Sequence, residues 1–111
     1  MKYSTLKLNK EFRRLYGRGK SFVQPSVVIY ILKNKYDEPR IGITTGKKIG
    51  CAVKRNRARR LITAAWHSCI DDLTVKNLDI VFVARTRIID MKSTEVEGAI
   101  RRAFQKAGVI K

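Results

Sequence analysis

Residues 47–62 read KKIGCAVKRNRARRLI, and the second half of this stretch has the pattern of a helix with one apolar and one basic face. It contains seven Lys and Arg residues and no Asp or Glu. Apolar residues recur every three or four positions from Ala58, which predicts a helix that ends near Cys69 or Ile70. The buried stripe of this helix would be Ala58, Leu61, Ile62, Ala65, Trp66 and Cys69. Its N-terminal turns would carry the basic side chains into solvent.

These basic side chains carry an electrostatic cost in the free protein. Cations near a helix N-terminus have the wrong sign for the helix dipole. Each pair of like charges one turn apart also costs roughly 0.2–0.5 kcal/mol, and no carboxylate stands nearby to offset it. An external polyanion would relieve both effects. A charged face that is simply solvated is the alternative interpretation.

The composition favours a polyanionic partner. The 111 residues include 25 Lys and Arg against 9 Asp and Glu, which gives a formal net charge of +16. Hydrophobic residues make up 44%, so we expect residues 1–111 to form a single folded domain rather than a disordered basic tail. No acidic residue lies between Glu38 and Asp71, which predicts one strongly positive face. Such a face is typical of proteins that bind nucleic acid or an anionic membrane surface.

Cysteine usage and the N-terminal sequence predict a cytoplasmic protein. Neither Cys51 nor Cys69 has a second Cys or a His at metal-ligand spacing, and two unpaired thiols indicate a reducing compartment. Met1 leads into a polar segment without the apolar core of a signal peptide. No run approaches the roughly 18 apolar residues of a membrane-spanning helix. We therefore expect a protein that is neither exported nor inserted in a membrane.

Periodicity in the rest of the chain predicts two further helices. One helix over residues 10–16 would be capped by Asn9 and stopped by Gly17. Another would begin with a capping box formed by Thr94 and Glu97 and would end before Gly108. Strand-like segments lie between them: a long strand over 21–32, whole or broken, a second at 40–44 that forms a hairpin with it, and a buried central strand at 79–84.

The order of these elements predicts the fold class. It is an α/β fold, a two-layer sandwich with the order α-β-β-(β)-α-β-α. The helices would pack against one face of the sheet. The other face would then be open to solvent or to a ligand.

Three sets of polar residues match catalytic motifs only in part. The loop from Gly42 to Lys48 has its glycines one residue too close for a phosphate-binding loop, and Lys48 stands where a Ser or Thr would hold magnesium. His67 has no partner whose position indicates a triad or a metal site, so we assign it no role. Asp71 and Asp72 follow the basic helix but belong to no larger acidic cluster, which disfavours a stand-alone nuclease that holds its own metal ions.

Four aromatic residues lie in the first helix and the first strand: Phe12, Tyr16, Phe22 and Tyr30. They are either unrelated core residues or the lining of a groove, and the spacing alone leaves both interpretations open. Tyrosine hydroxyls favour a position that reaches water. Flat rings beside Arg side chains are a usual way to hold single-stranded nucleic acid. Such a groove would be separate from the basic helix.

The basic stretch resembles the signature of a known family. Its pattern Lys47-Lys48-Ile49-Gly50-x-Ala52-Val53-x-Arg55-Asn56-Arg57-x-x-Arg60-Leu61-Ile62 is similar to that of the bacterial ribonuclease P protein subunit. Segments 6–12, 40–44 and 81–85 also resemble that family and occur in the same order. The resemblance implies a fold like the second domain of ribosomal protein S5, with a left-handed β-α-β crossover. Physical rules alone would favour a right-handed one.

The resemblance also implies two binding sites. The residues expected to face the catalytic ribonuclease P RNA are Lys47, Lys48, Lys54, Arg55, Asn56, Arg57, Arg59 and Arg60. Phe12, Tyr16 and Tyr30, with Phe22 as a weaker candidate, would line the cleft for the 5′ leader of precursor tRNA. Tyr16 departs from the phenylalanine common in the family. The implied reaction is endonucleolytic removal of that leader.

The implied chemistry belongs to the RNA rather than to the protein. Mg²⁺ ions held mainly by the RNA subunit would perform the hydrolysis, and the protein would have no catalytic residue. No membrane and no obligatory protein partner is inferred. Two rival interpretations remain: a ribosomal or general RNA-binding protein without enzymatic function, and a nuclease made of protein alone. The Arg55-Asn56-Arg57 helix argues against the first, and cleavage by the RNA-free protein would establish the second.

Overall fold

The structure is a computed structural model, and residues 2–111 are described. The strands are β1 (Ser4–Thr5), β2 (Lys20–Val23), β3 (Val27–Lys33), β4 (Arg40–Thr44) and β5 (Leu78–Ala84). The α-helices are α1 (Asn9–Arg18), α2 (Ala52–Cys69) and α3 (Ser93–Ala107). Short 3-10 helices are η1 (Lys47–Ile49), η2 (Ile70–Asp72) and η3 (Thr86–Asp90). The predicted α/β fold is confirmed, and the basic helix ends at Cys69 as predicted.

One five-stranded sheet runs in the order β1-β4-β5-β3-β2. β5 pairs with β3 in antiparallel and with β4 in parallel orientation, so it lies between them. The prediction that β4 forms a hairpin with the preceding strand is therefore wrong. The physical reason is burial: six of the seven residues of β5 are buried, and such a strand needs neighbours on both sides. β3 and β4 consequently separate to admit it.

The first long strand is broken in two. β2 turns at residues 24–26, which include Pro25, and returns as β3 in antiparallel register, with Phe22 opposite Ile29. Proline cannot donate a hydrogen bond within a sheet, so it falls at the turn rather than inside a strand. β2 becomes the edge of the sheet.

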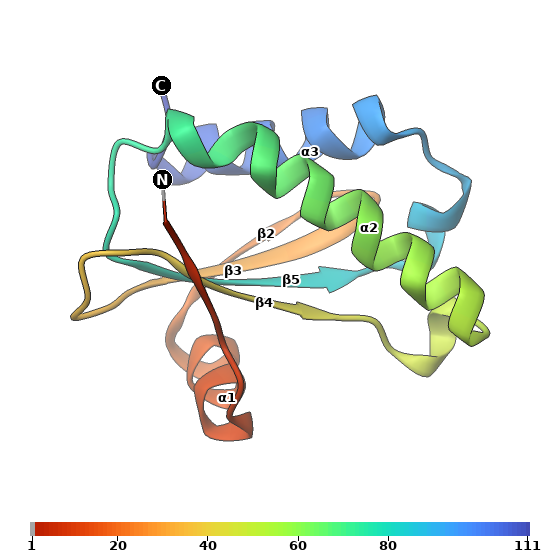
Figure 1. The fold of residues 1–111 in the computed structure, drawn as a ribbon, viewed down its shortest axis with the longest axis horizontal. Coiled ribbons are helices and arrows are strands. Elements are labelled where there is room, and N and C mark those ends of the chain that lie inside the picture. The colour runs from red at the N-terminus through yellow and green to blue at the C-terminus, as the bar shows by residue number, and fades with distance from the viewer. Residues whose placement is uncertain (1) are drawn as a thin grey trace.

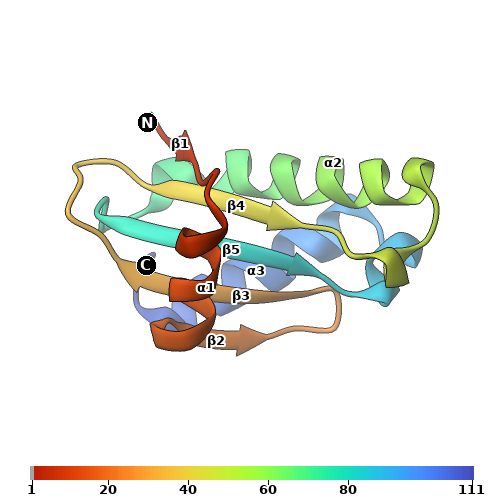
Figure 2. The same ribbon diagram turned by 90° about the horizontal axis from the view of Figure 1, so that it is seen from below.

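The connection from β4 through α2 to β5 is left-handed. In Figure 2 both strands point the same way and α2 passes behind them. Seen from the α2 side with the strands pointing upward, β5 lies to the left of β4. Nearly all parallel connections have the opposite hand. The handedness implied by the family resemblance is confirmed, whereas the likeness to ribosomal protein S5 stays a prediction.

The main core lies between the sheet and the pair α2 and α3 (Figure 1). All six apolar residues predicted for the α2 stripe are buried. Trp66 occupies the centre, with ring centroids 6.1 Å from Phe82 and 6.2 Å from Phe104. Three aromatic rings from three elements thus fix α2 and α3 against β5, and the basic end of α2 projects beyond the sheet.

Helix α1 covers part of the opposite face of the sheet (Figure 2), so the prediction that the helices pack against one face is wrong for α1. Leu15 is fully buried there in a small cluster with Leu6 and Val81. The Phe12 ring lies directly on Gly42: a Cβ atom at that glycine would stand 2.6 Å from the ring carbons. Gly42 therefore provides the space in which α1 sits close to β4.

Two predicted helix caps are wrong by a few residues. Asn9 is the first residue of α1 rather than its cap, and the Glu11 carboxylate instead accepts the Leu8 N–H at 3.1 Å. At α3 the Glu95 carboxylate accepts the Lys92 N–H at 2.9 Å, in place of a box formed by Thr94 and Glu97. In both helices a glutamate in the first turn satisfies a free N–H without a Ser or Thr cap. In such a cap the sequence shows the glutamate of the capping-box motif but not its Ser or Thr, so the helix start is harder to predict.

Candidate nucleic-acid interface

The predicted RNA-facing residues gather at one end of the molecule. We call this the basic surface: Lys47, Lys48, Lys54, Arg55, Asn56, Arg57, Arg59 and Arg60. All are exposed except Arg55, which is partly buried. The chain turns sharply from η1 into α2 at Gly50, whose φ of 129° is strained for any side chain. Ile49, 4% exposed, anchors the turn in the main core.

Two arginines of the basic surface also contact the protein itself. Arg57 donates to the carbonyl oxygens of Ile89 and Met91, each at 3.4 Å, so it bridges α2 to the end of η3. These are long contacts for hydrogen bonds. The Nε atom of Arg55 is buried without a hydrogen-bond partner among the described residues. The remaining basic side chains of this surface make no ion pair with a described carboxylate.

The N-terminus of α2 adds helix dipole and backbone donors to this positive charge. No acidic residue lies in its first turn, and no side chain caps it. Cys51 stands at the N-cap position and is exposed, and the backbone N–H groups of Lys54 and Val53 lower the pKa of its thiol. Amide groups that stabilise a thiolate would stabilise a phosphate oxygen in the same way. The arrangement is suited to bind anions.

Aromatic side chains form a groove on the other face of the sheet. Tyr16 of α1 and Tyr30 of β3 meet edge to face, with centroids 5.0 Å apart. A depression of about 410 Å³ beside them is lined by Asn9, Phe12, Arg13, Tyr16 and Thr44. We call this the aromatic groove. Phe12 and Tyr16 line it together with Arg13, and Tyr30 lies beside it through its contact with Tyr16.

The aromatic groove continues toward the basic surface. A second depression of about 470 Å³ shares Thr44 with it and is lined by Lys48, Arg85 and Thr86 among others. It lies where the parallel strands β4 and β5 end. Ligands commonly bind at the carboxyl ends of parallel strands. Sequence reasoning missed Arg85 and Thr86 because it paired β4 with the wrong strand.

Phe22 does not belong to the aromatic groove, so its prediction as a groove residue is wrong. It pairs with Ile29 and packs against the main core, on the α3 side of the sheet. Tyr30 points to the opposite face because side chains alternate along a strand. In a single strand from 21 to 32 the side chains of Phe22 and Tyr30 would share a face, so the prediction of one strand concealed that they lie on opposite faces.

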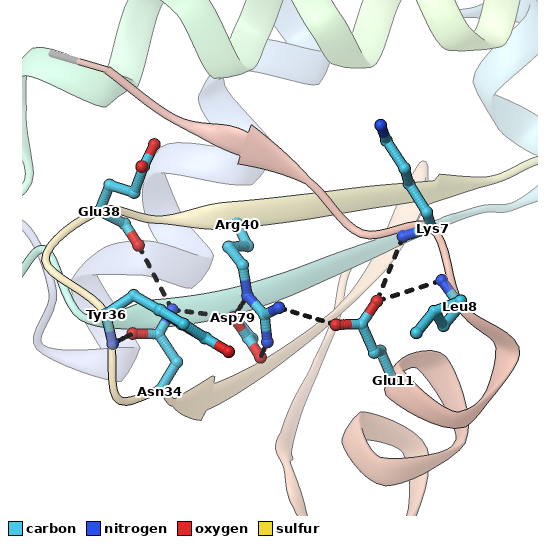
Figure 3. A network of polar contacts seen from close by, with 8 residues as sticks. All are labelled: Lys7, Leu8, Glu11, Asn34, Tyr36, Glu38, Arg40 and Asp79. Carbon is cyan, nitrogen blue, oxygen red and sulfur yellow. Dashed lines mark hydrogen bonds and ion pairs between the residues drawn. The ribbon is translucent and has the colours of Figure 1, made fainter.

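A buried ion-pair network holds α1, and with it the wall of the groove (Figure 3). Asp79 of β5 is 1% exposed. Its carboxylate accepts hydrogen bonds from Arg40 Nε at 2.8 Å and Nη2 at 2.7 Å, and from Asn34 Nδ2 at 2.8 Å. A buried carboxylate requires such full pairing. Hydrogen bonding to Asp79 raises the pKa of the Arg40 guanidinium.

Arg40 extends the network to α1. Its Nη1 atom donates to Glu11 Oε2 at 2.7 Å, and its guanidinium lies 4.5 Å from the centre of the Tyr36 ring. The other oxygen of Glu11 accepts the N–H groups of Leu8 at 3.1 Å and Lys7 at 3.3 Å. The hydrogen bond from the Leu8 N–H is the main cause that lowers the pKa of Glu11. The Lys7 N–H and the charge of Arg40 lower it further. One carboxylate therefore both caps α1 and ties it to the sheet, one residue before Phe12.

No described residues form a metal-binding cluster. Within residues 2–111 no three His, Cys, Asp or Glu side chains are grouped so as to hold an ion. His67 Nε2 lies 2.8 Å from the Tyr3 hydroxyl, which is a structural contact between the N-terminal segment and α2. Burial raises the pKa of Cys69 to about 11, which keeps this thiol protonated and unreactive. Neither Asp71 nor Asp72 contributes to a site of this kind.

We predict that Glu11→Gln destabilises the protein by about 1 kcal/mol near neutral pH, because the amide keeps the cap but loses the Arg40 ion pair. The folded-state pKa of Glu11 is lowered, so its stabilisation is present above the ordinary value of 4.5 and is lost as the pH falls through the folded-state value. Urea unfolding at several pH values would measure this.

Glu95→Gln is the matched control, since Glu95 caps α3 with no arginine partner. The difference in unfolding free energy between wild type and Glu11→Gln should shrink as the pH falls below about 4. If Glu11→Gln and Glu95→Gln lower the unfolding free energy by the same amount at every pH, the Arg40 ion pair does not contribute as proposed.

Comparisons with known proteins give a consistent result. A family model described as Ribonuclease P matches residues 1–108. The ribonuclease P protein component of Clostridium botulinum strain Langeland is 38% identical over 109 residues, which covers 98% of either chain. That of Clostridioides difficile strain 630 is 41% identical over 104 residues, covering 94% of this chain and 91% of the relative. The solved Staphylococcus aureus RNase P protein superposes with a TM-score of 0.86 at 30% identity, over 99% of this chain and all of that one.

Proposed function

We propose a division of labour between two surfaces, on the premise that the chain belongs to the ribonuclease P protein family. Members of this family are components of an endoribonuclease complex in tRNA processing. In our proposal the basic surface binds the catalytic RNA subunit and the aromatic groove binds the 5′ leader of precursor tRNA. The observation that carries it is the continuity of the two sites through Thr44.

Electrostatics support the assignment of the basic surface to the RNA subunit. A folded RNA presents a dense array of phosphates, and each contact with a Lys or Arg releases condensed counterions. The cations of this surface are mostly free of carboxylate partners, so little has to be broken when RNA binds. Backbone amides at the start of α2 add directional donors for phosphate oxygens.

The shape of the aromatic groove supports the assignment of the leader. Unpaired bases stack on aromatic rings with little sequence preference, which suits leaders of differing sequence. Arg13 offers a cation beside these rings, and Lys48 and Arg85 continue the positive charge to the basic surface. A leader held along this path would extend toward the bound RNA subunit, which would position the scissile bond.

We assign the hydrolysis and its Mg²⁺ ions to the RNA subunit, and we assign binding and positioning to the protein. Among residues 2–111 no three His, Cys, Asp or Glu side chains are grouped so as to hold a metal ion, which is consistent with this assignment. We further propose a cytoplasmic location without an obligatory protein partner, which the free thiols of Cys51 and Cys69 support. No helix within residues 2–111 is long and apolar enough to cross a bilayer.

The direct test is cleavage of 5′-labelled precursor tRNA at low magnesium concentration by a bacterial ribonuclease P RNA, with and without this protein. We expect the protein to stimulate cleavage at the mature 5′ end and to be inactive when added without the RNA. Cleavage by the protein alone would move the chemistry to the protein. Tight RNA binding without stimulation would instead favour a general RNA-binding protein.

Replacing Arg55 and Arg57 together by Ala should weaken binding to the RNA subunit and should lower the slope of log Kd against log salt concentration by about 1 to 2, because each phosphate contact contributes to that slope. The matched control is Lys35→Ala with Lys76→Ala, which removes the same charge from the loops before β4 and β5, whereas the basic surface follows the other end of β4. Equal losses in both variants, with native circular dichroism, would show that only net charge matters.

Phe12→Ala and Tyr30→Ala should each weaken binding of leader-bearing precursor tRNA by about 1 to 3 kcal/mol, the range expected for one stacked base. Binding of leaderless tRNA should change much less. Tyr36→Ala serves as the control, since the Tyr36 ring is exposed and lines neither depression. An equal loss of affinity on both substrates would contradict the assignment of the groove.

A further inference from the structure

Phe22 lines a pocket that neither of the proposed RNA sites includes. This pocket has a volume of about 520 Å³, and it lies where β2 begins and where β3 and α3 end. That is the end of the molecule opposite to the start of α2 (Figure 2). We call it the Phe22 pocket. Its size falls within the range of sites that bind small organic molecules.

The floor of the Phe22 pocket is apolar and is fixed by the main core. Phe22 is only partly buried and packs on that core from the edge strand. Ile31 beside it is 8% exposed, and Leu78 and Val109 are 2% and 6% exposed. These neighbours are held by β3, β5 and the segment after α3, so the aromatic ring lies in a rigid setting. A flat apolar group can cover this floor at little conformational cost.

The rim of the Phe22 pocket is cationic. It carries Arg18, Lys20, Lys33 and Lys106, which come from the ends of α1, β2, β3 and α3. All four side chains are exposed, and none makes an ion pair with a described carboxylate. No acidic residue lines the pocket. The fold thus collects four cations from distant parts of the sequence around one apolar floor.

This combination selects a ligand with a flat apolar body and an anionic group. A membrane surface would need a wider apolar face, and a bare phosphate would leave the floor uncovered. We propose that the Phe22 pocket binds one unpaired nucleotide, with its base against Phe22 and its phosphate among Lys20, Lys33 and Lys106. The same chemistry is offered by a free nucleoside monophosphate and by an extruded nucleotide of an RNA chain. This site does not depend on the proposed roles of the basic surface or the aromatic groove.

The test is an NMR titration of the ¹⁵N-labelled full-length protein with adenosine 5′-monophosphate, inorganic phosphate and adenosine. The monophosphate should shift the amide signals of Lys20, Phe22, Lys106 and Val109 in a saturable manner. Adenosine and phosphate should each shift them more weakly at equal concentration, because each engages only half of the site. Equal shifts by phosphate alone, or shifts confined to the aromatic groove and the basic surface, would overturn the proposal.

Two variants separate the parts of the site. Phe22→Leu keeps the apolar volume but loses the ring, and it should weaken monophosphate binding about 5-fold or more, as expected for one lost stacking contact. Lys106→Gln should weaken binding of the monophosphate but leave the weak binding of adenosine unchanged. Lys92→Gln is the control, since it removes an equal charge at the start of α3, whereas the pocket lies at the end of that helix. If Lys92→Gln lowers the affinity as much as Lys106→Gln, the pocket is not a specific site.

The source of the nucleotide is distinguished by competition with the assembled complex. Fluorescence anisotropy of etheno-adenosine monophosphate can be followed as ribonuclease P RNA is added to the protein. Release of the probe would identify a nucleotide of the RNA subunit as the occupant. Retention of the probe, with release only by precursor tRNA or by unlabelled monophosphate, would identify the substrate or a free nucleotide respectively. If the probe does not bind to the protein before RNA is added, the proposal fails.

Discussion

The burial of β5 on both faces is the constraint on which the rest of this structure depends. A strand with so many buried residues needs a strand on either side and a layer of side chains above and below. β3 and β4 supply the neighbours, α2 and α3 cover one face, and α1 covers part of the other. Because β5 enters the sheet next to β4, both strands end at the same edge. The positive charge of η1, α2 and Arg85 collects there.

The basic residues of this protein fall into two groups, those that pair with carboxylates and those that do not. Carboxylates are used where the fold needs them: Asp79 and Glu11 hold Arg40, and Asp72 holds Arg101 of α3. The stretch from η1 through the first half of α2 has none, and its cations make no ion pair with a carboxylate of the described residues. Arg40 therefore stabilises the fold, whereas Arg55 belongs to the surface that we propose for RNA binding, so replacing one is a different experiment from replacing the other.

Local patterns in the sequence were sufficient for some features and not for others. The stripe from Ala58 to Cys69 and the apolar run before Ala84 predict α2 and β5, because burial imposes a strict period on a helix and a continuous apolar run on a central strand. The position of β5 between β3 and β4 is a property of the whole sheet and leaves no local mark. The same error concealed Arg85 and Thr86. Phe22 was misplaced because a break at Pro25 reverses the chain and puts its side chain on the α3 side.

Gly42 has a consequence for what the aromatic groove can admit. Since this residue has no side chain, Phe12 settles on the backbone of β4 and presents only its other surface to solvent. The groove then offers a single stacking layer against a flat sheet. If the groove binds RNA as we propose, an unpaired strand can stack its bases there, whereas the bases of a double helix already stack on their own neighbours and gain nothing by entering it. The missing Cβ atom of Gly42 would then favour unpaired over paired RNA.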